Sequence, residues 1–86
     1  ADPRMRFWIA AALGESEDTT ASPQLIIMLK NEPSLMVRYK TAEALGSVGT
    51  AAAIDPLRSR LKTEPWYVAN YMRAALRSLA ARRIAR

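Results

Sequence analysis

The chain has 86 residues, 50% hydrophobic and 24% charged, which is the composition of one small globular domain and not of a disordered segment. It contains no cysteine and no histidine, which excludes a disulfide framework, a zinc finger and catalysis based on a thiol or an imidazole. The net charge of +5 is uneven: residues 1–55 carry −2, whereas residues 56–86 carry +7. No apolar run is long enough to span a membrane and no convincing signal peptide is present, so we expect a cytoplasmic location.

The first two predicted helices form a pair. One is expected near Pro3–Leu13 and the other near Thr20–Asn31, with the polar loop ESEDTT between them. Pro23 lies near the start of the second helix, where backbone N–H groups have no partner within the helix and proline is tolerated.

The segment MVRYKTAEALGSVG (residues 36–49) predicts a third helix. On a helical wheel one stripe contains Val37, Thr41, Ala44, Leu45 and Val48. Ser34 is the expected N-cap, and Gly46 and Gly49 are expected to end the helix.

A fourth helix is predicted over Ala51–Lys62 and a fifth over Trp66–Ala80. The inward residues of the fourth are Ile54, Leu57 and Leu61, and Pro56 lies near its start. Continuing the fifth helix would put three arginines on its apolar stripe: Arg82, Arg83 and Arg86. We therefore expect this helix to end near Ala80, with Ile84 at the start of a missing second helix.

The chain matches itself when it is shifted by 32 residues. Across residues 5–33 there are 11 identities without a gap, among them Arg6 with Arg38 and Glu32 with Glu64. A third copy begins at Glu64 with an offset of 31. A period of this length predicts a helix pair that is stacked into an array.

The second copy, VRYKTAEALGSVG followed by AAAIDPL, closely resembles the HEAT repeat in its short form shared with phycobilisome-lyase proteins. The residues that carry the resemblance are Val37, Arg38, Ala42, Ala44, Leu45, Gly46, Gly49, Ile54, Leu57, Leu61 and Lys62. The resemblance implies an all-α, right-handed α-α superhelix of about five helices. We expect one domain over 1–86, with units 1–31, 32–63 and an incomplete 64–86, a length typical of an excerpt of a longer array.

In HEAT-like solenoids the second helices line the concave face, which is the usual binding surface. On that face we expect the partner-binding residues to be Ile27, Met28, Arg58, Arg60 and Lys62. The alternative is that a neighbouring repeat or chain covers Ile27 and that the arginines are only solvated.

The unfinished third unit suggests a second surface. Its helix lacks a partner, so it should leave partly uncovered the residues Val68, Met72, Leu76 and Leu79. A second copy of the chain, another subunit or further repeats would complete it, and a monomer of two and a half units is the alternative.

The function predicted from these features is a non-enzymatic interaction or scaffold module that docks a protein partner or forms a homo-oligomer. No catalytic residues, metal or cofactor are expected, because no phosphate-binding loop, metal-ligand cluster or nucleophile elbow is visible. One alternative is an accessory subunit of a chromophore-lyase-like protein. Another, less favoured, is a nucleic-acid-binding module that uses Arg73, Arg77 and the aromatic residues of the first helices. For those aromatic residues, packing between repeats is the favoured role.

Overall fold

The structure is a computed structural model that describes the backbone of residues 2–84 and the side chains of residues 2–82. This part of the chain contains five α-helices and no strand: α1 (Pro3–Glu15), α2 (Ser22–Asn31), α3 (Leu35–Val48), α4 (Ile54–Leu61) and α5 (Trp66–Ile84). Short 3-10 turns, Thr19–Ala21 and Ala51–Ala53, precede α2 and α4. The all-α, HEAT-like class expected from the sequence is confirmed.

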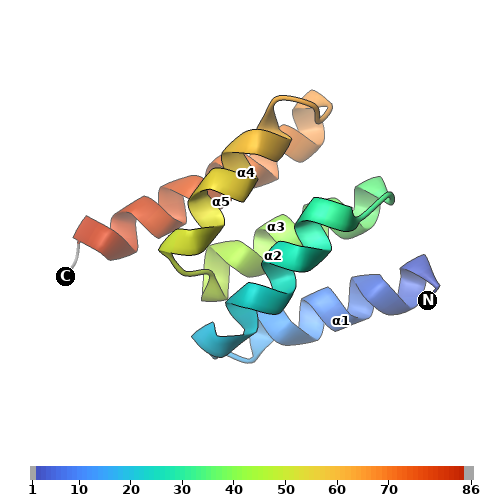
Figure 1. Ribbon diagram of the computed structural model, residues 1–86, viewed down its shortest axis with the longest axis horizontal. Coiled ribbons are helices and arrows are strands. Elements are labelled where there is room, and N and C mark those ends of the chain that lie inside the picture. The colour runs from blue at the N-terminus through green and yellow to red at the C-terminus, as the bar shows by residue number, and fades with distance from the viewer. Residues whose placement is uncertain (1, 85–86) are drawn as a thin grey trace.

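The helices form two layers (Figure 1). The first helices of the three units, α1, α3 and α5, lie side by side in one layer. The second layer consists of α2 and α4, which pack on one side of the first. The molecule measures 38 × 27 × 17 Å, and its shortest dimension matches two packed helices at about 8–10 Å between axes. The third helix, α3, contacts α1, α2 and α5, so it is the central element of the fold.

The helix starts follow the expected capping chemistry. Asp2 accepts a hydrogen bond from the Arg4 backbone N–H at 2.8 Å and caps α1. The Ser34 hydroxyl accepts from the Val37 backbone N–H at 3.5 Å, which confirms Ser34 as the N-cap of α3.

Two glycines allow the first helices to approach one another closely. A Cβ atom at Gly14 would lie 2.8 Å from the Ala44 Cβ, and one at Gly46 would lie 3.3 Å from the Ala75 Cα. Gly46 was expected to help end its helix, but α3 continues to Val48. Its role is packing of α3 against α5, because a side chain there would push the two backbones apart.

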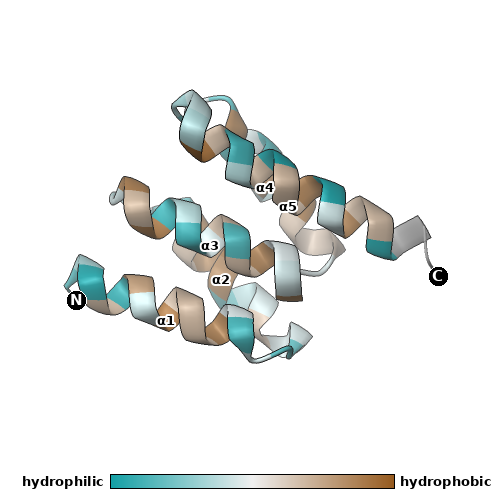
Figure 2. Ribbon diagram, turned by 180° about the vertical axis from the view of Figure 1, so that it is seen from behind, coloured by the Kyte–Doolittle hydropathy of each residue, from teal (hydrophilic) through white to brown (hydrophobic). Residues whose placement is uncertain are grey.

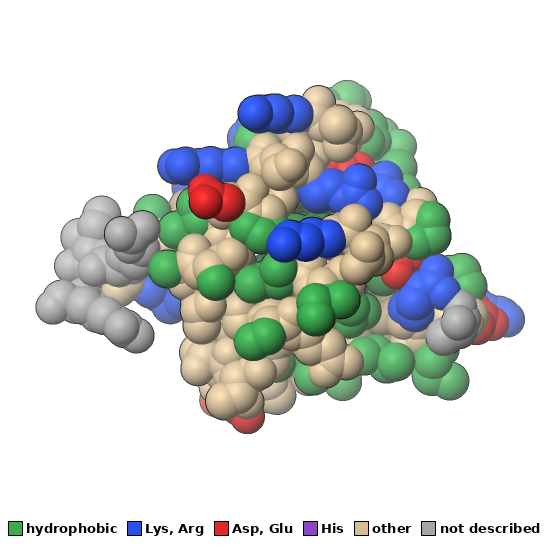
Figure 3. All heavy atoms as spheres, viewed as in Figure 1, with side chains coloured by type: hydrophobic (Ala, Val, Ile, Leu, Met, Phe, Trp, Pro, Cys, Tyr) green, Lys and Arg blue, Asp and Glu red, His purple; other side chains and the backbone are tan. Residues whose placement is uncertain are grey.

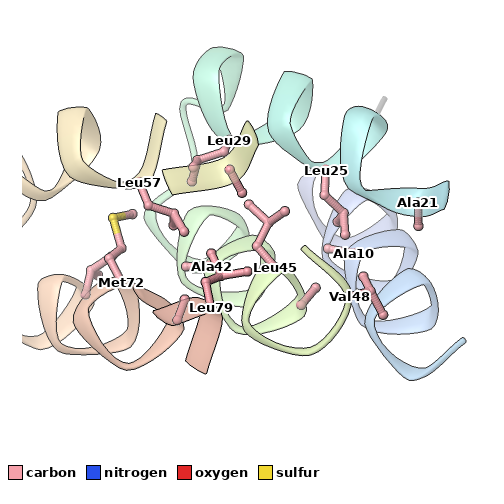
Figure 4. Packing of buried hydrophobic residues seen from close by; sticks show 14 residues of the cluster. Ala10, Ala21, Leu25, Leu29, Ala42, Leu45, Val48, Leu57, Met72 and Leu79 are labelled. Carbon is pink, nitrogen blue, oxygen red and sulfur yellow. The ribbon is translucent and has the colours of Figure 1, made fainter. Parts of the chain in front are cut away.

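The core lies between the two layers. The largest fully buried side chains are Leu25, Leu29, Leu45, Leu57 and Met72, drawn together in Figure 4. A polar link joins the units beside this core: the Thr50 backbone N–H donates to the fully buried Ser22 hydroxyl at 3.0 Å. Ser22 stands where the second unit has isoleucine, and the hydrogen bond explains why a polar residue is accepted there.

The expected exposed stripe on α5 is wrong. Val68, Met72 and Leu79 are 0–3% exposed, and Leu76 is half-buried. The cause is the position of α5 within the array. Its apolar stripe packs on α3 and α4, so the helix completes its core without a second helix of its own.

The expected end of α5 near Ala80 is also wrong, because the helix continues to Ile84. Arg82 does not enter the core. Its guanidinium donates to the carbonyl oxygens of Gly46, Ser47 and Gly49, with 2.7 Å to Gly49. These carbonyls lie at the C-terminal end of α3 and have no partner within the helix. The side chains of Arg83, Ile84 and Arg86 lie outside the described residues.

Candidate functional site

The predicted partner-binding residues lie on the layer formed by α2 and α4. Figure 3 shows this layer from outside, with hydrophobic and basic side chains interspersed on it. Ile27 is 62% exposed, Arg58 and Lys62 are exposed, and Met28 is half-buried against the core. The structure therefore leaves Ile27, Arg58 and Lys62 accessible, and their use by a partner stays a prediction.

Arg60 has an internal role. Its Nε donates to the Leu29 carbonyl at 3.1 Å and its Nη2 donates to the Glu32 carbonyl at 3.0 Å. These groups belong to the last turn of α2 and the residue that follows it, where carbonyl oxygens lack helical partners and a cation is favourable. Arg60 thus links α4 to the end of α2 by hydrogen bonds and is not a free cation on the surface.

The same ion pair joins each complete unit to the start of the next. The Arg6 guanidinium donates to the two carboxylate oxygens of Glu32 at 2.7 and 2.9 Å. One period later, Arg38 donates to both oxygens of Glu64 at 2.6 and 2.9 Å. The two carboxylate side chains are only 3% and 1% exposed, so both pairs are shielded from water. Such bidentate contacts fix the relative orientation of the two side chains in addition to pairing their charges.

The first pair changes the acidity of its members. The Arg6 guanidinium is the main cause that holds the pKa of Glu32 below its usual range, and the Ser34 backbone N–H adds to the effect at 2.9 Å. Burial opposes this shift by favouring the neutral carboxyl. The same contact raises the pKa of Arg6.

These pairs were not recognised from the sequence, although the signal was present. Arg6 and Arg38 share a register, as do Glu32 and Glu64, and 26 residues separate each arginine from its glutamate. The corresponding position of the third unit is Ala69, which is 2% exposed. The ion pair therefore marks the two units that have both of their helices.

The aromatic residues gather on the layer of first helices, which Figure 2 shows from its outer side. The rings of Phe7 and Tyr39 have centroids 6.1 Å apart, and those of Tyr39 and Tyr71 are 4.5 Å apart. This supports the expectation that aromatic residues pack between repeats. However, Trp8 and Trp66 remain 67% and 73% exposed.

Within residues 2–84 no helix is long and apolar enough to cross a membrane. In the same part of the chain no three His, Cys, Asp or Glu side chains form a group that could hold a metal ion.

Comparisons with known proteins give a family and a set of relatives. The family model of HEAT repeats matches residues 1–80, which confirms the resemblance seen in the second unit. Deoxyhypusine hydroxylase of Arabidopsis thaliana is 41% identical over 58 residues, covering 65% of this chain and 18% of that protein. The proteins of the same name from Saccharomyces cerevisiae and Candida albicans are each 36% identical over 58 residues, covering 66% of this chain and 18% of theirs. No solved structure matches significantly.

These relatives overturn the functional class expected from the sequence. A non-enzymatic interaction or scaffold module was predicted, whereas the matching curated proteins are named for an enzymatic activity. The chain spans 18% of the length of these relatives. The earlier prediction failed because the absence of catalytic motifs in a segment says nothing about the protein to which such repeats belong.

Proposed function

Since the chain belongs to the HEAT-repeat family, we propose that it is a segment of a HEAT-repeat enzyme related to deoxyhypusine hydroxylase. The supporting observation is the similarity to proteins of that name from three organisms. A continuous match over 65% of the chain must include its middle, so it contains α3 (Leu35–Val48). The similarity therefore involves the central helix of the fold and not only its edges.

The contribution that we propose for this segment is architectural. Enzymatic hydroxylation of carbon draws on a metal or an organic cofactor for the oxygen chemistry. The described residues do not provide a group of metal ligands, so we assign no chemical step to them. Instead, the Arg38–Glu64 pair and the Thr50–Ser22 hydrogen bond hold the units in a fixed relation. A rigid array of this kind would position catalytic groups that lie elsewhere in such an enzyme.

A chimeric enzyme tests the proposal. The 58-residue matching segment of the Saccharomyces cerevisiae protein is replaced by the corresponding segment of this chain, and conversion of deoxyhypusine is followed by mass spectrometry as the gain of one oxygen atom. The matched positive control carries the Arabidopsis thaliana segment. The negative control carries Leu45→Asp in this chain's segment, which places a carboxylate at a fully buried position of the core.

We expect the chimera and the positive control to hydroxylate and the Leu45→Asp chimera to be inactive. A folded chimera without activity, alongside an active positive control, would show that the similarity is limited to the repeat architecture. In that case the assignment to this class of enzyme would be withdrawn.

A further inference from the structure

A groove lies along one side of α4, where this helix meets the C-terminal half of α5. It has a volume of about 420 Å³ and is lined by Ala51, Ile54, Asp55, Arg58, Leu76 and Ala80. Figure 1 shows that α2 lies on the other side of α4 and that the C-terminal part of α5 projects beyond α4. The groove is therefore at the edge of the second layer, on the side away from α2.

The repeat shows what occupies the same place one unit earlier. A shift by 32 residues takes Arg58 to Ile26, and a shift by 31 takes Leu76 to Leu45. In the first unit α4 packs beside α2, Ile26 is half-buried against the core and Leu45 is fully buried. Leu76, by contrast, is only half-buried. Since the equivalent place beside α2 is taken by a helix, we expect the groove to accept a helix as well.

The groove differs from its counterpart in charge. Arg58 stands where the first unit has Ile26, and Asp55 stands where it has Pro23. Both charged side chains are exposed, and neither forms an ion pair or a side-chain hydrogen bond with another described residue. Residues three apart lie on the same face of a helix. The occupant should therefore place a cation opposite Asp55 and a carboxylate opposite Arg58.

We propose that a second copy of the chain occupies the groove, with its α4 antiparallel to α4 of the first. In a two-fold dimer each surface meets itself, so any contact between two different residues occurs twice. An antiparallel pair centred between residues 55 and 58 places Asp55 of each copy opposite Arg58 of the other. The same register places Lys62 opposite Ala51, so that no two like charges face each other across the pair. This inference does not rest on the proposed enzymatic context.

The other described helices do not offer such a pair of charges. Neither α2 (Ser22–Asn31) nor α5 (Trp66–Ile84) contains an acidic residue, and α1 has no basic residue within one turn of Glu15. In α3, Lys40 and Glu43 have the same spacing as Asp55 and Arg58, but they pair with each other at 2.7 Å. Within the described residues, α4 is thus the helix whose opposite charges are open to a second copy.

The dimer should be weak. The apolar part of the contact comes mainly from Ile54 and Leu76, both of which are half-buried already. Interfaces that bury less than about 1,200 Å² are typical of transient complexes. The two crossed ion pairs would then decide which surfaces meet more than how tightly they bind.

Charge reversal tests the inference with the chain alone. Sedimentation velocity of the 86-residue chain is measured at concentrations up to about 1 mM, at which weak complexes are populated. We expect the unaltered chain to dimerise. Asp55→Lys creates two like-charge contacts in a symmetric dimer, and so does Arg58→Glu. Each variant alone should therefore dimerise about tenfold more weakly, or not at all.

Mixing the two variants is the decisive step. In a pair of one Asp55→Lys chain and one Arg58→Glu chain, both contacts again join opposite charges. The equimolar mixture should therefore dimerise more tightly than either variant alone, by about tenfold or more. Native mass spectrometry should identify the complex as the mixed dimer by its mass.

Matched controls separate this contact from the effect of net charge. Glu15→Lys and Lys30→Glu make the same changes of net charge at exposed positions outside the groove, and each should leave the affinity within about twofold. Ala80→Arg puts a long side chain into the groove from α5 and should weaken dimerisation by about tenfold or more. It serves as the groove variant if circular dichroism shows that a charge reversal alters the fold.

Three outcomes would overturn the inference. One is a monomer at every concentration of the unaltered chain. Another is a mixture of the two reversed chains that associates no better than either chain alone. The third is a dimer that survives both charge reversals and Ala80→Arg, because the contact would then lie on another surface.

Discussion

Substitution of Arg38 should lower the free energy of unfolding more than most substitutions of partly exposed residues in this chain. Arg38 makes two hydrogen bonds to Glu64 and two more to the carbonyl oxygens of Glu32 and Pro33, at 3.2 and 2.8 Å. The Glu64 side chain is 1% exposed. Arg38→Met keeps an unbranched side chain but leaves the buried Glu64 carboxylate without its ion-pair partner. Breaking a buried pair from one side costs about 3–5 kcal/mol, which is a large fraction of the stability of a small domain.

The second half of the cycle separates the charge from the packing. In Arg38→Met combined with Glu64→Leu, no buried charge is left, and replacing both members of a buried pair by apolar residues is often nearly neutral. The double variant should therefore be more stable than Arg38→Met alone by about 2 kcal/mol or more. Simple additivity would make it less stable than either single variant.

Urea denaturation, followed by far-UV circular dichroism at neutral pH, measures these free energies of unfolding. Arg58→Met is the matched control, because Arg58 is exposed on α4, and it should change stability by less than about 0.5 kcal/mol. A loss below about 1 kcal/mol for Arg38→Met, or additive behaviour in the cycle, would refute the view that the shielded pairs hold the units together.

Three further predictions concern the first unit and the core. Because the Arg6 contact lowers the pKa of Glu32, the stability from this pair is complete above about pH 4.5, the ordinary value, and is lost as the pH falls through the lowered pKa. Denaturation curves across acid pH should show this loss, and Arg6→Met should flatten it; identical acid profiles would contradict the prediction. Gly14→Ala should destabilise by about 1 kcal/mol or more in thermal unfolding, because its Cβ would lie 2.8 Å from Ala44 and overpacking outweighs the better helix propensity. Leu45→Ala should cost about 2–5 kcal/mol in the same assay, since Leu45 is fully buried between the layers; a loss under about 1 kcal/mol would mean that the site is not core.

The helices could be predicted from local signals. The period of 32 residues, the Ser34 cap and the prolines at the starts of α2 and α4 place each first helix and second helix within a few residues of its observed bounds. These signals work because they depend on the chain nearby. The all-α class follows from them without knowledge of the tertiary contacts.

The roles of the arginines depended on groups far away in the sequence. A helical wheel shows that Arg82 follows the apolar stripe of α5, but not that the guanidinium reaches carbonyl oxygens at the end of α3. Likewise, Arg60 is 31 residues from the Leu29 carbonyl that it contacts. Part of the basic charge of residues 56–86 is thus used to cap helices, which the charge count alone could not reveal.

The functional class was harder to predict than the fold. The residues that match the HEAT pattern, such as Leu45 and Gly46, are packing residues, and packing is common to proteins with unrelated activities. The aromatic residues are visible in the sequence, but the ring contacts of Tyr39 with Phe7 and with Tyr71 required the first helices to be placed side by side.

The hydroxylation assay on the Saccharomyces cerevisiae chimera is the most direct measurement of the central claim, that this chain is a segment of an enzyme related to deoxyhypusine hydroxylase. We predict that the chimera adds oxygen to deoxyhypusine and that Leu45→Asp abolishes the reaction. A correctly folded chimera that leaves deoxyhypusine unchanged, while the Arabidopsis thaliana segment supports the reaction, would contradict it.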